Sequence, residues 1–253
     1  SSPVGSVRLA GVVLIFVTCV LVRFALQVPV GAFRQAGVVV LVLGVVSALY
    51  GAFAALAQSD LKRLVAYTSV NHMGYVIVGV AVAAITLDPS VRTVALDGAV
   101  LQMFSHGLVT GALFLLVGMI QDRAHTREMG ELGGLLKTVP MLGWTFVLAA
   151  FASLGLPGLA HFPAEFQIFL ATLSASPAAV VVILGIAIIA GTFLKALRET
   201  FLGEPRQRWQ SMPDLSAREW LAVGPLLVLT VGTGVAPSWV LGIIHRTTSA
   251  LAL

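Results

Sequence analysis

The chain alternates long apolar blocks with short polar stretches. Each block holds about 20 residues or more, the length that an α-helix needs to cross the ~30 Å hydrocarbon core of a bilayer at ~1.5 Å per residue. The blocks cover residues 7–27, 36–57, 64–85, 96–120, 141–173, 179–201 and 220–244. This pattern predicts an all-α fold, a polytopic transmembrane helical bundle of about seven spans, with residues 1–253 forming one membrane domain.

The block 141–173 differs from the other six in length. As one helix it would extend roughly 50 Å, and it is too short for two spans joined by a turn. It contains Gly155-Leu156-Pro157-Gly158, where proline removes a backbone donor and glycine weakens a helix. We therefore expect two half-helices that form one broken span, with Gly155, Pro157 and Gly158 at the hinge.

The loop charges test this interpretation, because cytoplasmic loops of membrane proteins are enriched in Lys and Arg. If the block crosses once, eleven basic residues share one side: Arg8, Lys62, Arg63, Arg123, Arg127, Lys137, Lys195, Arg198, Arg206, Arg208 and Arg218. The other side has four: Arg23, Arg34, Arg92 and Arg246. Two crossings would give seven against eight. The single broken crossing is favoured, with the start of the chain cytoplasmic, its C-terminus outside, and a multi-pass location in the inner (cytoplasmic) cell membrane.

Composition supports the membrane class. Hydrophobic residues make up 58% of the chain and charged residues 10%, with a mean hydropathy of +0.99, whereas about 25% of a soluble domain is charged. The net charge of +4 would suggest nucleic acid in a soluble protein, but these basic residues lie in short loops between spans. We expect a lipid bilayer as partner and no nucleic acid. The sequence has no spaced Cys/His metal set and no phosphate-binding glycine motif, so no metal or cofactor is expected in this chain.

Three ionisable residues, His72, His106 and Glu165, lie inside apolar blocks. Ionisable groups are costly in hydrocarbon and usually face a bundle interior or a wet cavity, so this set predicts an ion path. Imidazole can receive a proton on one nitrogen and release one from the other, which suits a relay. The alternative is that these groups are hydrogen-bonded within the bundle and only fix its packing.

Two lysines near span ends complete the candidate proton path. Lys62 follows Ser59 and Asp60 at an expected helix start, where structure and membrane orientation also explain a basic residue. Lys195 lies two turns before the end of its span. It can extend its ammonium to the interface, or it can act as a terminal proton acceptor.

Several motifs carry a resemblance to a known family. Residues 59–75 (SDLKRLVAYTSVNHMGY) closely resemble the antiporter-like membrane subunits of respiratory complex I. Residues 102–107 (QMFSHG), 122–127 (DRAHTR) and 155–158 (GLPG) look most like subunit M, called chain 4 in mitochondria. The motifs occur in order over nearly the whole chain.

This resemblance implies a fold of fourteen helices with two inverted five-helix repeats, of which the chain resembles the C-terminal half from the eighth helix onward. His72 and His106 would lie on a central hydrated axis, and Glu165 would be the acidic residue on the broken helix near the proton exit. The chain would be a proton-translocating subunit of an NADH:quinone oxidoreductase (a translocase) bound to other membrane subunits. NADH, flavin, iron–sulfur clusters and quinone would belong to partner subunits.

One departure keeps other functions open. The segment 9–15 aligns with a stretch where these subunits carry a central lysine, and this chain has Ile15 there. A Mrp-type sodium/proton antiporter would use the same fold and residues. A hydrogenase-linked or carbon-uptake membrane subunit, or a structural spacer with an impaired proton path, also fits. The sequence does not choose between proton and sodium.

Overall fold

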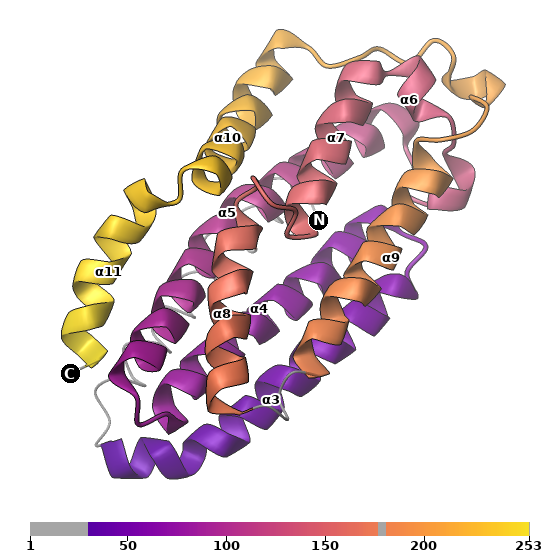
Figure 1. Cartoon of the computed structure of the whole chain (residues 1–253). Coiled ribbons are helices and arrows are strands. Elements are labelled where there is room, and N and C mark those ends of the chain that lie inside the picture. Colours follow the sequence, from indigo (N-terminus) through magenta and orange to yellow (C-terminus); the bar gives the residue numbers. More distant parts are fainter. Residues whose placement is uncertain (1–29, 177–180, 253) are drawn as a thin grey trace.

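The computed structural model describes residues 30–176 and 181–252, and helices build this part of the chain (Figure 1). The predicted first span and Ile15 lie outside the described residues. Within the described ranges the only extended pairing is an isolated bridge between Asp60 and Glu128. The long helices are α3 (Val30–Leu56), α4 (Leu61–Ile85), α5 (Pro89–Ala124), α7 (Pro140–Ser153), α8 (His161–Ala175), α9 (Leu184–Thr200), α10 (Ala217–Val235) and α11 (Ser238–Ala252). Shorter turns are η2 (Met129–Glu131), α6 (Leu135–Thr138) and η4 (Gln207–Trp209).

Four of the described helices are long and apolar enough to cross a membrane. They are α3, α4, α5 and, counted from Val181, α9, and the bent pair α10–α11 makes up to five. Helix α7 is a shorter apolar helix, and its relation to α8 is described below. The predicted all-α polytopic membrane bundle is confirmed.

Small residues bring α3 and α4 into backbone contact. A Cβ added to Gly74 would lie 2.5 Å from the Ala48 backbone nitrogen, and one added to Gly51 would lie 2.4 Å from that of Asn71. The Asn71 amide also donates to the Ala48 carbonyl at 2.8 Å. Small residues and polar side chains are the usual means of association between membrane helices. This contact fixes the face of α4 that points into the bundle.

The predicted hinge residues lie between two helices, since α7 ends at Ser153 and α8 begins at His161. Gly155 and Gly158 have φ of +70° and +89°, a left-handed conformation that glycine adopts without a Cβ clash. Pro157 lies between them and cannot donate a backbone hydrogen bond.

The two half-helices cross the bundle once. At the start of α7, the backbone N–H of Met141 donates to the Asp214 carboxylate. Arg123, near the end of α5, donates to the backbone carbonyl of the same Asp214, so the start of α7 lies near the end of α5. At the other end of the pair, Leu170 and Ser174 of α8 line one hollow with Ser90 of α5. Together α7 and α8 therefore run antiparallel to the length of α5, as Figure 1 shows.

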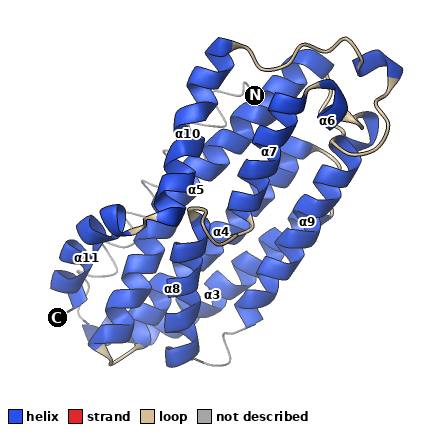
Figure 2. Cartoon of the chain, turned by 45° about the horizontal axis from the view of Figure 1, so that its top comes forward, coloured by secondary structure: helices blue, strands red, loops and turns tan. Residues whose placement is uncertain are grey.

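The expectation of one continuous span over 220–244 is wrong. The segment consists of α10 and α11, which meet at an angle of 72° at Ala236 and Pro237. Proline disfavours the helical conformation in the residue before it, and Ala236 accordingly has φ −131° and ψ 66°. Figure 2 shows this bend beside the loop between α7 and α8. A Cβ on Gly234 would lie 2.3 Å from the Gly158 carbonyl carbon, so the two breaks touch.

Candidate functional site

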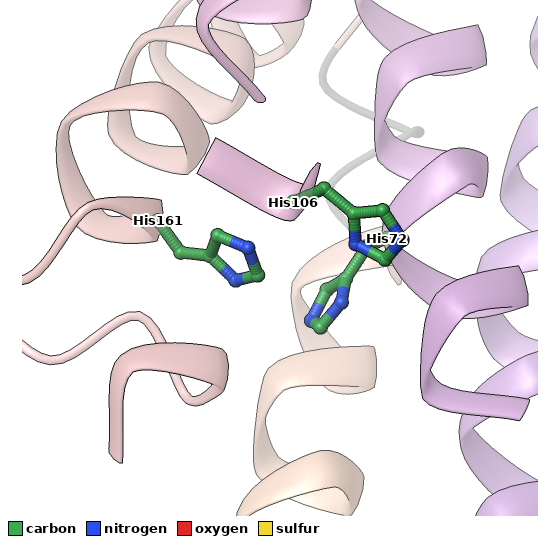
Figure 3. A group of neighbouring side chains, drawn as sticks. All are labelled: His72, His106 and His161. Atoms are coloured by element: carbon green, nitrogen blue, oxygen red, sulfur yellow. The ribbon is translucent and has the colours of Figure 1, made fainter. Parts of the chain in front are cut away.

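Three histidines from three helices meet inside the bundle (Figure 3). His72 comes from α4, His106 from α5, and His161 is the first residue of α8. All three are at most 1% exposed, and one ring nitrogen from each lies within 4.8 Å of the others. The His72 and His161 rings are closest, with centroids 4.6 Å apart. The structure thus brings the two predicted histidines together and adds a third.

Glu165 joins the three rings from one turn further along α8. Its Oε1 lies 3.9 Å from His72 Nε2 and 3.9 Å from His161 Nδ1, and the Gln102 amide on α5 donates to it at 3.4 Å. We call His72, His106, His161 and Glu165 the histidine cluster. These four side chains can each bind a proton, and they lie close together in the buried interior.

The broken helix shapes the cluster directly. A Cβ added to Gly155 would lie 2.3 Å from Glu165 Oε2, so only glycine at this hinge position leaves room for the carboxylate. The last carbonyls of a helix have no partner within it, and His72 Nε2 lies 3.1 Å from the carbonyl oxygen of Ser153, the last residue of α7. The break therefore both admits Glu165 and supplies a backbone acceptor to His72.

The cluster and its neighbours Gln102 and Ser153 contain several buried polar atoms without a hydrogen-bond partner among the described residues. They are His72 Nδ1, His106 Nε2, both ring nitrogens of His161, Gln102 Oε1 and Ser153 Oγ. Most buried polar atoms in proteins are hydrogen-bonded, to protein or to ordered water. A concentration of such atoms is therefore a site suited to bind water or an ion.

The distance between the ring nitrogens is relevant to whether the histidines bind a metal ion or water. Three imidazoles can bind a transition metal, but Zn–N bonds of about 2.0–2.1 Å require ring nitrogens roughly 3.3 Å apart. A water molecule that bridges two nitrogens with hydrogen bonds of about 2.8–2.9 Å holds them roughly 4.6 Å apart. The three ring nitrogens all lie within 4.8 Å of one another, a range that accommodates bridging water.

The two candidate lysines lie together at one end of α4, separate from the histidine cluster. Lys195 Nζ donates to the carbonyls of Leu56 and Gln58 at 3.0 Å each, at the end of α3. Lys62 lies in the first turn of α4, next to the N-cap Asp60 and ten residues (roughly 15 Å) before His72. The Lys195 ammonium therefore caps the C-terminus of α3, where a cation is favoured.

Sequence reasoning did not assign a role to His161 or to Asp97. His161 precedes Glu165 by four residues, so helical spacing could have placed both on one face of α8. Asp97 is a buried carboxylate on α5 whose Oδ2 lies 2.7 Å from His245 Nδ1 of α11. No local pattern pointed to that pair, because 148 residues separate its members in the chain.

Comparison with known proteins agrees with this fold. The family described as NADH:quinone oxidoreductase/Mrp antiporter, TM, matches residues 1–190. NADH-quinone oxidoreductase subunit M of Pseudomonas aeruginosa is 39% identical over 240 residues, which cover 94% of this chain and 45% of that protein. The chain thus spans less than half the length of this relative.

Two solved structures resemble the described bundle. A chain of respiratory complex I from Thermus thermophilus is 32% identical with a TM-score of 0.79, covering 86% of this chain and 44% of that one. A chain of the Mrp complex from Dietzia shares the fold, with 23% identity and a TM-score of 0.74 over 87% of this chain and 48% of that one. The chain belongs to the NADH:quinone oxidoreductase/Mrp antiporter transmembrane family.

Proposed function

We propose that this chain is part of a proton-translocating membrane subunit of an NADH:quinone oxidoreductase. The carrying observation is the buried histidine cluster at a helix break, with unpartnered nitrogens that can bind water and a carboxylate within 3.9 Å of two rings. A subunit M that is 39% identical supports the parent complex. Residues 1–253 would form one membrane domain, which corresponds to less than half of the length of the related subunit M.

In this proposal, protons move along water between the side chains of the cluster. Protonated His106 passes its proton through water to His161 or His72. The proton then moves to Glu165, whose carboxylate lies 3.9 Å from both of these rings. Electrostatic changes that originate in redox-active partner subunits would shift the proton affinity of these groups. NADH, flavin, iron–sulfur clusters and quinone would bind to those partners, and this chain would contribute no redox centre.

The ligand set favours protons over sodium. Hard cations bind to several oxygen ligands, whereas the described cluster is dominated by imidazole nitrogens with one carboxylate. Lys62 and Lys195 would form the entry end of the path at the cytoplasmic side. The positive-inside count supports this proposed orientation, with the start of the chain in the cytoplasm and the C-terminus outside the inner cell membrane.

Replacement of Glu165 by glutamine tests the proposal. In membranes that contain the assembled complex, Glu165→Gln should lower the number of protons moved per NADH oxidised, because the amide keeps the shape but cannot bind the proton. Glu204→Gln is the matched control, since that carboxylate is exposed and pairs only with Lys137 among described residues. Unchanged proton stoichiometry in Glu165→Gln would refute the role.

A second candidate is a Mrp-type sodium/proton antiporter, which the shared fold with the Dietzia Mrp complex favours. The same vesicles separate the two functions. Sodium-dependent proton movement without NADH would support the antiporter, and NADH-dependent movement that is insensitive to sodium would support the oxidoreductase subunit.

A further inference from the structure

A second buried carboxylate lies closer to one end of the bundle than the histidine cluster does. Asp97 of α5 is 6% exposed, and its carboxylate binds two side chains of α11. Asp97 Oδ2 lies 2.7 Å from His245 Nδ1, and Oδ1 accepts a hydrogen bond from Thr248. The His245 side chain is 59% exposed. A single hydrogen bond therefore links a buried carboxylate to an imidazole at the surface of the described chain.

Asp97 lies on α5, the helix that also contacts Glu165 of α8, whereas His245 lies on α11. Gln102, which donates to Glu165, follows Asp97 by five residues, or roughly 7.5 Å along α5. Between them α5 and α8 are in backbone contact, since a Cβ on Gly98 would lie 2.9 Å from the Ile168 nitrogen and 3.0 Å from the Ala164 carbonyl. The contact of α5 with Glu165 thus lies about one and a half turns beyond Asp97 along the helix.

An apolar layer separates the two carboxylates. It consists of Leu101, Ala164, Val240 and Ile244, which pack as one buried cluster. Leu101 follows Asp97 by one turn, Ala164 directly precedes Glu165, and Ile244 directly precedes His245. Apolar constrictions in membrane paths exclude water and so block ions until they hydrate.

We propose that Asp97 and His245 form a second proton-binding site, separated from Glu165 by this apolar layer. The inference rests on the proposed function. The Glu165 carboxyl group gives its proton to water that enters the layer, and that water passes a proton to the Asp97–His245 pair. His245 then releases a proton to water, and both carboxylates return to their starting state. In the proposed orientation this end of α5 faces outside, so the site would serve release.

The surrounding charges are compatible with such a site. In the first turns of α5 lie Asp88, at the N-cap, and Arg92. On α11 the neighbouring charge is Arg246, which is exposed. Helix α8 contributes only His161 and Glu165 as ionisable residues, both in the histidine cluster. The nearest ionisable partner of Asp97 among the described residues is His245 itself.

The competing explanation is that Asp97 only holds α11 against α5. The variants Asp97→Asn and His245→Gln remove the titratable groups but keep hydrogen-bonding side chains. Thr248→Val is the matched control, since it removes a hydrogen bond to the same carboxylate without removing a titratable group. A purely structural contact would respond to all three changes alike, through assembly.

The test measures protons moved per NADH oxidised in membranes that carry the assembled complex, with Glu165→Gln alongside. Asp97→Asn and His245→Gln should lower the stoichiometry to the level of Glu165→Gln, whereas Thr248→Val should retain the unmodified value. If only Glu165→Gln lowers it, the second site is refuted and the proposed function stands. If Glu165→Gln also changes nothing, the proposed function fails and the second site fails with it.

A variant of the apolar layer gives an independent readout. Val240→Thr adds a hydroxyl at nearly constant volume and should help water enter the layer. A pH gradient across vesicles without NADH should then decay faster than in unmodified vesicles, and combination with Asp97→Asn should reverse the acceleration. An unchanged decay rate in Val240→Thr would overturn the role of the layer.

Discussion

Two polar clusters in this bundle satisfy their hydrogen bonds very differently. Near the end of α5, Arg123 binds both carboxylate oxygens of Glu219 at 2.7 Å and donates to the carbonyls of Pro213 and Asp214. The Asp214 carboxylate in turn accepts from the backbone N–H groups of Met141 and Leu142. The histidine cluster instead retains unpartnered nitrogens.

This difference predicts different roles for the two clusters. A network with all of its donors matched has one low-energy arrangement, so the arginine cluster (Arg123, Asp214 and Glu219) fixes the ends of α5, α7 and α10. The histidine cluster has free positions that water and protons can use. We expect changes in the arginine cluster to act on stability, and changes in the histidine cluster to act on proton movement.

The largest effect on stability is expected from Arg123→Met. It leaves the Glu219 carboxylate, whose side chain is 23% exposed, without its bidentate partner. We expect a loss of about 2–4 kcal/mol in the free energy of unfolding, seen as a lower thermal midpoint of the detergent-solubilised complex. Complex that still assembles at low temperature should move protons with unchanged stoichiometry. A lowered stoichiometry there would remove the distinction between the clusters.

Gly155→Ala should have an intermediate effect. Alanine at φ +70° costs about 1–2 kcal/mol, and its Cβ would also displace the Glu165 carboxylate. Gly158→Ala is the control, because it has the same left-handed strain at φ +89° but nothing within 4 Å of the added carbon. Both variants should lower the thermal midpoint, and only Gly155→Ala should lower proton stoichiometry. Equal stoichiometry in the two would contradict the positioning of Glu165 by the hinge.

His161→Gln should change stability least. His161 is fully buried and its ring packs against those of His72 and His106, so we expect a loss of about 1 kcal/mol, the typical cost of a single substitution. NADH-driven proton movement should fall, while Gln167→Ala on the same helix should leave it unchanged. A large drop in thermal midpoint with normal proton movement would show that His161 is a packing residue.

The sequence predicted the parts of the site that local pattern can reveal. His72, His106 and Glu165 stood out because each is costly within an apolar block, and the Gly155–Gly158 hinge stood out because proline and glycine interrupt a helix. The same reasoning failed for 220–244, where apolar composition continues through Pro237 and hides the 72° bend. The roles of Lys62 and Lys195 remain predictions, since a position at the start of α4 and a contact with the end of α3 fit both a cap and a path.

By itself, the sequence determined that this protein is a helical membrane bundle with a helix break at Gly155–Gly158. Those features follow from the length of apolar segments and from single residues that cannot continue a helix. Only the tertiary structure decided that His161 faces His72, that Asp97 meets His245, and that the two helix breaks touch at Gly158 and Gly234. These contacts join residues far apart in the chain, and they depend on how closely small residues let the helices approach, which no local periodicity encodes.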